Sequence, residues 1–62
     1  MNVFEKIKML RQLKGWTQED MANKLEISLN SYGAIERGDT NVNLSRLQKI
    51  SEVLEVDIAE LF

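Results

Sequence analysis

Apolar residues recur at intervals of three and four along most of the chain, which is the period of an α-helix with one buried side. Four stretches follow this pattern, at about residues 2–13, 18–25, 29–37 and 44–54. A shorter stretch after Asp57 contains Ile58, Leu61 and Phe62. With no proline and only three glycines, the sequence predicts a single all-α domain of five helices over residues 1–62.

Polar residues and glycines mark where these helices begin and end. Thr17 followed by Asp20 resembles a capping box, although aspartate replaces the usual glutamate. Ser28 is a good helix cap, and Gly38 is a good helix stop. Only two residues separate the second predicted helix from Ser28, so the turn is sharp, and Glu26 is expected to take a left-handed conformation.

Composition excludes several classes of protein. The 62 residues suffice for one domain with a small core, and the chain contains neither cysteine nor histidine. Disulfides, thiolate metal sites and the commonest general base are therefore absent. No apolar run approaches the roughly 18 residues of a membrane span, and the N-terminus lacks the order of a secretory signal. We expect a cytoplasmic domain with no metal, cofactor or membrane contact.

Charge is distributed unevenly along the chain. The net charge of −2 argues mildly against a nucleic-acid partner, because proteins that bind polyanions usually carry a basic surplus. Residues 1–38 contain six basic and five acidic side chains, whereas residues 39–62 contain two and five. A bound anion is therefore expected to meet the first part of the chain.

Several motifs at fixed spacings are more specific than these patterns. They are Arg11, the segment GWTQEDMA at 15–22, Ile27-Ser28, the segment IERG at 35–38 and the tail from Leu47 to Phe62. Together they resemble the Cro and lambda-repressor-like (XRE-type) helix-turn-helix family over nearly the whole chain. The resemblance implies a five-helix domain that binds double-stranded DNA as a homodimer and regulates transcription, often as a repressor, with helix 29–37 in the major groove.

The resemblance also implies which residues read the DNA bases. They form what we call the reading face: Leu29, Asn30, Gly33 and Ala34. Asn30 is able to make the bidentate contact with adenine, and Leu29 and Ala34 suit thymine methyl groups. Gly33 is expected to leave the helix surface bare, so that the backbone approaches the groove closely. The alternative is that the small and apolar positions are unselected, or that they pack against a second protein.

Contacts to DNA phosphates are implied for a second set of residues. They are Thr17, Gln18, Ser28, Arg37, Thr40, Asn41 and Asn43. A helix N-terminus favours an anion on physical grounds, which supports a phosphate contact at Gln18. The alternative is that Gln18 is only a solvated residue in the first turn of the helix. Hydroxyls and amides donate to phosphate without carrying charge, so affinity should be moderate and depend weakly on salt.

Structural roles are expected for five further residues. Arg11 and Glu36 match positions that form a partly buried ion pair between the first and third helices of relatives. Leu61 and Phe62 are expected at the dimer interface, because they end the chain with apolar groups. Tyr32 is expected in the core, with its hydroxyl reaching solvent.

Two other kinds of function are alternatives to DNA binding. A protein-binding module of the antitoxin or antirepressor type is favoured by the acidic charge and the nearly neutral helix at 29–37. An enzyme is disfavoured, because the adjacent acids Glu19 and Asp20 lie where a helix start attracts acids, and nothing supplies a nucleophile with its base.

Overall fold

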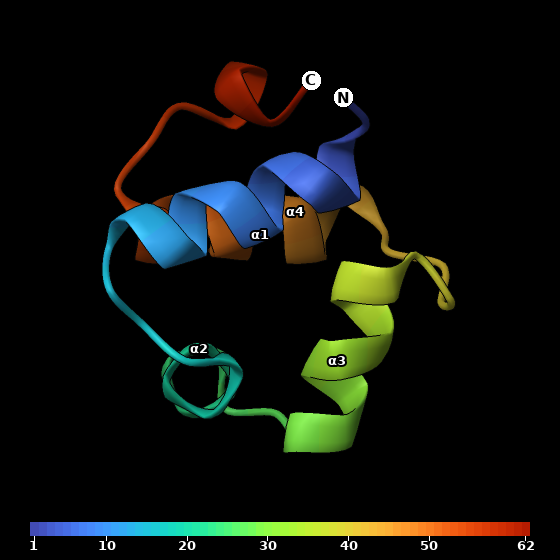
Figure 1. Ribbon diagram of the computed structural model, residues 1–62. Helices are drawn as coiled ribbons and strands as arrows, with labels where there is room; N and C mark the ends of the chain where they lie inside the picture. Colours follow the sequence, from blue (N-terminus) through green and yellow to red (C-terminus); the bar gives the residue numbers. More distant parts are fainter.

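Helices account for all the regular structure in the computed structural model, which describes every residue of the chain (Figure 1). The elements are α1 (Val3–Leu13), α2 (Gln18–Leu25), α3 (Leu29–Arg37), α4 (Leu44–Leu54) and the 3₁₀ helix η1 (Ile58–Leu61). The prediction of an all-α fold is confirmed. The prediction of five α-helices is wrong, because the last segment forms one four-residue 3₁₀ helix. So short a segment closes i→i+3 hydrogen bonds, such as Glu60 N to Asp57 O at 2.9 Å.

The helices divide into two parts that lie one above the other in Figure 1. In the upper part, α1 lies in front of α4, and the segment containing η1 lies above α1. In the lower part, α2 is seen nearly along its axis while α3 runs across the view, so these two helices cross steeply. Contacts of α3 with α1 and of α2 with α4 join the two parts.

Each α-helix begins at a side chain that caps its first turn. The cap residues are Asn2, Thr17, Ser28 and Asn43. The expected capping box is present: Thr17 Oγ1 accepts from Asp20 N at 3.0 Å, and Asp20 Oδ2 accepts from Thr17 N at 2.8 Å. Local sequence therefore decides these helix starts, because each cap satisfies backbone donors that the helix itself leaves free.

Each α-helix also ends in the same way, with one residue in the left-handed region. Two of these residues are glycines, Gly15 and Gly38. The other two are Glu26, with φ 59°, and Glu55, with φ 61°. The conformation predicted for Glu26 is confirmed, whereas the one at Glu55 was not predicted. After Glu26, Ile27 N donates to Ala22 O at 3.0 Å, which closes the Schellman motif between α2 and α3.

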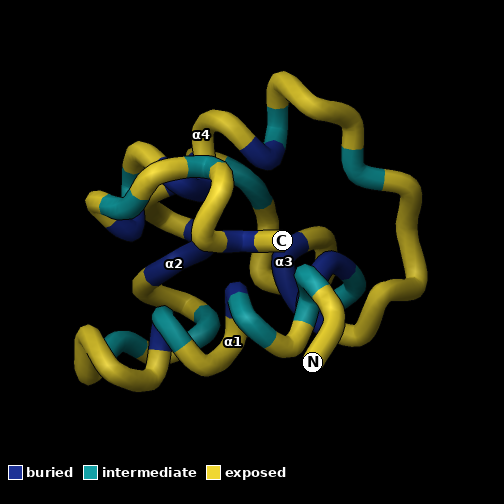
Figure 2. The backbone as a smooth tube through the Cα atoms, turned by 90° about the horizontal axis from the view of Figure 1, so that it is seen from above, coloured by how far each residue is buried: buried dark blue, intermediate teal, exposed yellow.

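One core of ten buried apolar residues lies among the helices, and Figure 2 marks the buried positions along the chain in dark blue. Its members are Ile7, Met21, Ala22, Leu25, Tyr32, Ile35, Leu47, Ile50, Leu54 and Leu61. Tyr32 belongs to the core as predicted, but its hydroxyl is buried and does not reach solvent.

Leu61 lies in this core and is 0% exposed, so its predicted place at a dimer interface is wrong. The physical reason is that η1 packs against both α1 and α4, which directs this side chain inward. Phe62, in contrast, is 66% exposed. Its carbonyl oxygen accepts a hydrogen bond from Lys6 Nζ at 2.8 Å, which ties this segment to α1.

Replacing Glu26 with glycine should raise the free energy of unfolding by up to about 1 kcal/mol. The left-handed conformation costs a residue with a Cβ about 1 to 2 kcal/mol, and glycine avoids this cost. About half of the benefit is offset, because glycine loses more backbone entropy on folding. Urea denaturation measures the change. The matched control is Glu52→Gly inside α4, which should lower the free energy of unfolding by about 1 kcal/mol. Destabilisation by both substitutions would refute the assignment of strain to Glu26.

Candidate nucleic-acid interface

A buried ion pair holds α3 against α1. Arg11 Nε lies 2.6 Å from Glu36 Oε2, and Arg11 Nη2 lies 3.2 Å from Glu36 Oε1. The two side chains are only 8% and 2% exposed. The third guanidinium nitrogen, Nη1, donates to the Trp16 carbonyl at 2.6 Å. The pair implied by the resemblance is thus present, and the same guanidinium also holds the connection between α1 and α2.

Gln18 extends this network to α2, because its Nε2 donates to Glu36 Oε1 at 3.1 Å. Burial by itself would raise the pKa of Glu36, but hydrogen bonds from Arg11 and Gln18 outweigh it and hold that pKa below its usual value. The Tyr32 hydroxyl lies beside this carboxylate without a hydrogen bond of acceptable geometry. Burial and the negative charge of Glu36 raise the pKa of Tyr32.

The outward side of α3 holds the four residues of the reading face, which differ in exposure. Leu29 is 47% exposed, Asn30 is exposed and Ala34 is half-buried. Gly33 is buried, so the expectation of a bare surface at this position is wrong. The reason is that a side chain from the end of the helix covers it: Arg37 Nη1 lies 3.2 Å from the point that a Cβ on Gly33 would occupy.

Two of the predicted phosphate contacts, Thr17 and Asn43, are helix caps whose side chains keep hydrogen-bond donors free. Thr17 Oγ1 and Asn43 Oδ1 accept from backbone N–H groups of α2 and α4, which leaves the threonine hydroxyl hydrogen and the asparagine amide hydrogens unused by the cap. Ser28 differs, because its hydroxyl donates to Ser31 Oγ at 2.9 Å. The free hydroxyl hydrogen at the start of α3 therefore belongs to Ser31.

The side chain and the backbone of Gln18 have separate partners. Its side-chain amide donates inward to Glu36, so this half of the predicted phosphate contact is occupied inside the protein. Its backbone N–H lies in the first turn of α2, where an α-helix has no acceptor of its own to offer. An anion at this helix start would meet that N–H group and the positive end of the helix dipole.

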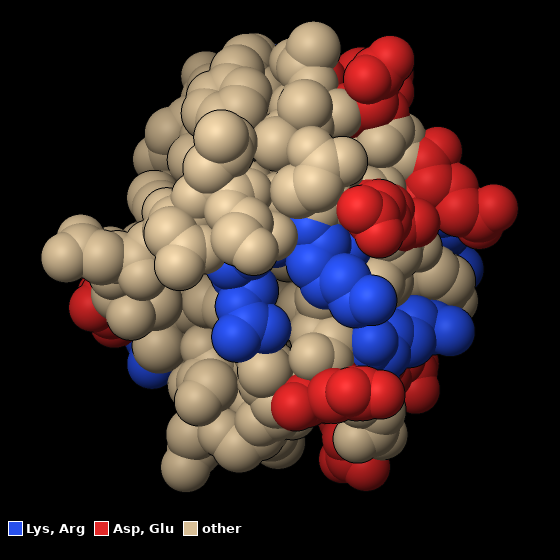
Figure 3. All heavy atoms as spheres, turned by 180° about the vertical axis from the view of Figure 1, so that it is seen from behind, with Lys and Arg blue, Asp and Glu red and all other residues tan.

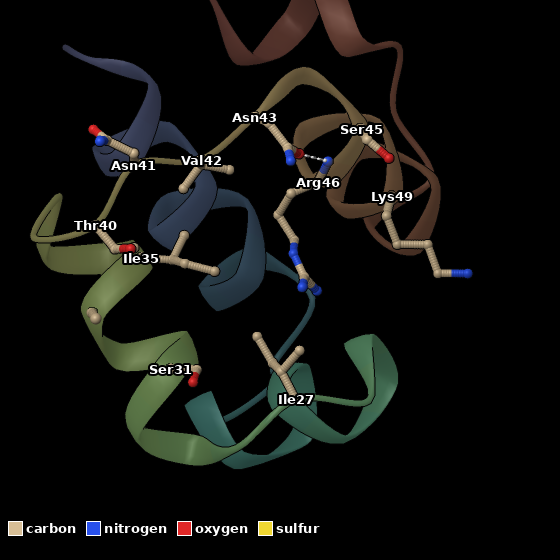
Figure 4. Close-up of a pocket in the computed structure, with 11 residues that line it drawn as sticks. Ile27, Ser31, Ile35, Thr40, Asn41, Val42, Asn43, Ser45, Arg46 and Lys49 are labelled. Carbon is tan, nitrogen blue, oxygen red and sulfur yellow. Dashed lines mark hydrogen bonds between the residues drawn. The ribbon is translucent and has the colours of Figure 1, made fainter.

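A groove of about 650 Å³ runs between α3, the following loop and α4 (Figure 4). Thr40, Asn41 and Asn43 from the loop line it, and all three were predicted phosphate contacts. Two residues that the sequence analysis missed also line it, Arg46 and Lys49 of α4. In Figure 4 the Arg46 guanidinium points into the space between α4 and Ile27, while Lys49 points outward.

Arg46 and Lys49 were missed because the apolar spacing of residues 44–54 indicates only which side of that helix faces the core. Their spacing of three residues was the available signal, since it places both on one side of a helix. Neither forms a salt bridge within the chain. Figure 3 shows basic side chains gathered near the middle of the face seen from behind, with acidic ones mainly toward one edge. A negative net charge thus coexists with a local basic area.

Comparison with known proteins agrees with this geometry. The family model described as helix-turn-helix matches residues 7–61. The chain belongs to the helix-turn-helix family. The helix-turn-helix unit itself consists of α2, the turn at Glu26 and α3, which Gln18 and the Arg11–Glu36 ion pair hold in place.

Relatives of this helix-turn-helix protein are named as regulators. An uncharacterized HTH-type transcriptional regulator of Bacillus subtilis, YazB, is 39% identical over 56 residues, which are 90% of this chain and 81% of that protein. Control protein C.MunI of a Mycoplasma species is 40% identical over 92% of this chain and 78% of its own length. The phage transcriptional repressor RstR of Vibrio cholerae is 36% identical over 98% of this chain and 54% of that protein. No helix here has the length and hydropathy needed to cross a membrane.

Replacing Glu36 with alanine should lower the free energy of unfolding by about 3 to 5 kcal/mol, because it leaves the Arg11 charge buried without its partner. The matched control is Glu52→Ala, an exposed glutamate of α4, whose effect should stay within about 0.5 kcal/mol. Urea denaturation at neutral pH compares the two variants. Equal denaturation midpoints would show that the ion pair does not hold the domain together.

Proposed function

We propose that this protein is a DNA-binding transcriptional regulator that places α3 in the major groove. The observation that carries the proposal is the outward side of α3, which the Arg11–Glu36 pair holds in a fixed orientation while Leu29 and Asn30 remain exposed. Membership of the helix-turn-helix family supports it, as do relatives named transcriptional regulators. The relative named a repressor favours repression as the mode of regulation.

Sequence is read by the exposed residues of the reading face. The Asn30 amide accepts from N6 and donates to N7 of one adenine, and this double contact distinguishes adenine from the other bases. Leu29 and Ala34 contribute apolar contacts to thymine methyl groups. Specificity from so few contacts is modest, so the sequence-dependent shape of the duplex contributes as well.

Phosphates are held on both sides of α3. On one side, the first turn of α2 offers the Gln18 N–H and the Thr17 hydroxyl. On the other side, the groove offers the amides and hydroxyls of the loop together with Arg46 and Lys49. These contacts position the protein without reading sequence, because phosphates are the same at every base pair.

The regulator acts as a homodimer, because one helix in one groove rarely provides enough specificity and a two-fold dimer matches palindromic sites. With Leu61 buried, the exposed Phe62 and the outward side of η1 remain as the apolar part of the proposed contact. A second candidate function, a protein-binding module of the antitoxin or antirepressor type, is favoured by the net charge of −2 and by the nearly neutral α3.

Binding to a random-sequence duplex tests the DNA-binding function directly. The protein should bind measurably at low salt, and the logarithm of its association constant should fall linearly with the logarithm of salt concentration. Each phosphate neutralised contributes about −0.9 to that slope, so the few basic residues here should give a value of about −2 to −4. Fluorescence anisotropy of a labelled duplex measures both quantities. No affinity at low salt would favour the protein-binding module.

Replacing Asn30 with alanine should weaken binding to a preferred site by about 1 to 3 kcal/mol and change binding to random duplex little. The preferred site is first obtained by selecting bound duplexes from a random pool. Asn23→Ala, which removes an exposed asparagine of α2, is the matched control and should leave both affinities unchanged. Equal losses on both duplexes would make Asn30 a backbone contact.

A further inference from the structure

Arg37 is the one basic residue of α3, and its side chain turns back along the helix toward Gly33. A Cβ at Gly33 would lie 3.2 Å from Arg37 Nη1 and 4.0 Å from Gln18 Oε1. A separation of 3.2 Å is tighter than nine in ten real contacts of a Cβ atom, so the guanidinium would have to shift by a few tenths of an ångström. The missing side chain of Gly33 therefore leaves the space in which the guanidinium lies, one helical turn before the Cα of Arg37.

Asp39 contacts the opposite edge of the same guanidinium. Arg37 Nε donates to Asp39 Oδ2 at 2.9 Å, and the two side chains are 63% and 61% exposed. This bond uses the Nε edge of the guanidinium. The end that carries Nη1 and Nη2 keeps its donors for another partner, and a pair of parallel donors is what the O6 and N7 atoms of guanine accept.

We propose that Arg37 reads a guanine in the major groove, with Gly33 providing the space for its guanidinium and Asp39 orienting it. The inference rests on the DNA-binding function proposed above and gives the reading face its one charged contact. Because the guanidinium lies over Gly33, about three residues or 4.5 Å along the helix from Asn30, the guanine lies about one or two base pairs from the adenine.

A phosphate contact, the role that the resemblance implies for Arg37, fits this geometry less well. A phosphate can also accept two parallel bonds from an arginine, so the paired donors alone do not decide between the two roles; the space at Gly33 and the Asp39 carboxylate do. The exposed Asp39 carboxylate would repel a phosphate approaching the same guanidinium. A neutral base edge suffers no such repulsion, whereas two bonds to guanine benefit from the orientation that Asp39 imposes.

Arg37→Lys is the sharpest test, because it keeps the positive charge and removes the planar pair of donors. Anisotropy titrations compare the unaltered protein and the variant on three duplexes: the selected site, the same site with the guanine·cytosine pair replaced by adenine·thymine, and random sequence. The variant should lose about 5- to 100-fold on the selected site. It should lose less than about threefold on random duplex, because its charge is retained, and it should no longer distinguish the first two duplexes.

Two further variants separate base reading from general attraction. Gly33→Ala displaces the flexible end of Arg37 and should reduce the preference for guanine without lowering the thermal midpoint, because alanine is the better helix former. Arg46→Ala removes a charge from the groove and should weaken binding to all three duplexes by the same factor.

The outcomes separate this inference from the function on which it rests. A uniform loss for Arg37→Lys on all three duplexes, or no loss on any, would overturn guanine reading by Arg37 while DNA binding stands. A selected site without a guanine near the adenine would overturn it too. Failure of the unaltered protein to bind any duplex at low salt would overturn the DNA-binding function, and this inference with it.

Discussion

The orientation of α3 depends on one buried carboxylate, that of Glu36. It accepts hydrogen bonds from Arg11 of α1 and Gln18 of α2, while the Arg11 guanidinium also binds the carbonyl of Trp16 between those helices. Burying two charges costs several kcal/mol per ion, which the Coulomb attraction and these bonds offset. What the pair contributes is geometric, because charged hydrogen bonds have preferred directions whereas apolar packing tolerates rotation of one helix against another.

A side chain that caps a helix inside the fold also remains able to donate outward. Thr17 and Asn43 use an oxygen as the cap acceptor, and their hydrogens stay available to a ligand. Such free donors also explain how a chain with a negative net charge can bind a polyanion. Uncharged donors and two helix N-termini add to the attraction of a few local basic side chains. Net charge is therefore a weak guide to partners when the distribution of charge over the surface differs from its distribution along the sequence.

Sequence reasoning succeeded for most features decided by neighbouring residues, although it missed the left-handed Glu55, and it failed for several features decided by packing. The left-handed conformation of Glu26 followed from the short connection between α2 and α3. So few residues can turn the chain sharply only if one of them adopts a left-handed backbone. Leu61 was misplaced because an apolar residue near the end of a chain has the same pattern whether it faces the core or a partner. Arg46 was missed because its groove forms only where α3, the following loop and α4 come together in the fold.

The sequence by itself determined the helix boundaries, the caps, the all-α class and the membership of the family, because these depend on spacing and on bonds between residues three to five apart. Only the tertiary structure decided that Leu61 is buried and that Gln18 turns inward to Glu36. The physical reason is that burial and side-chain direction are properties of several helices packed together. A long side chain such as that of Gln18 takes the space that neighbouring helices leave, and no one-dimensional pattern records that space.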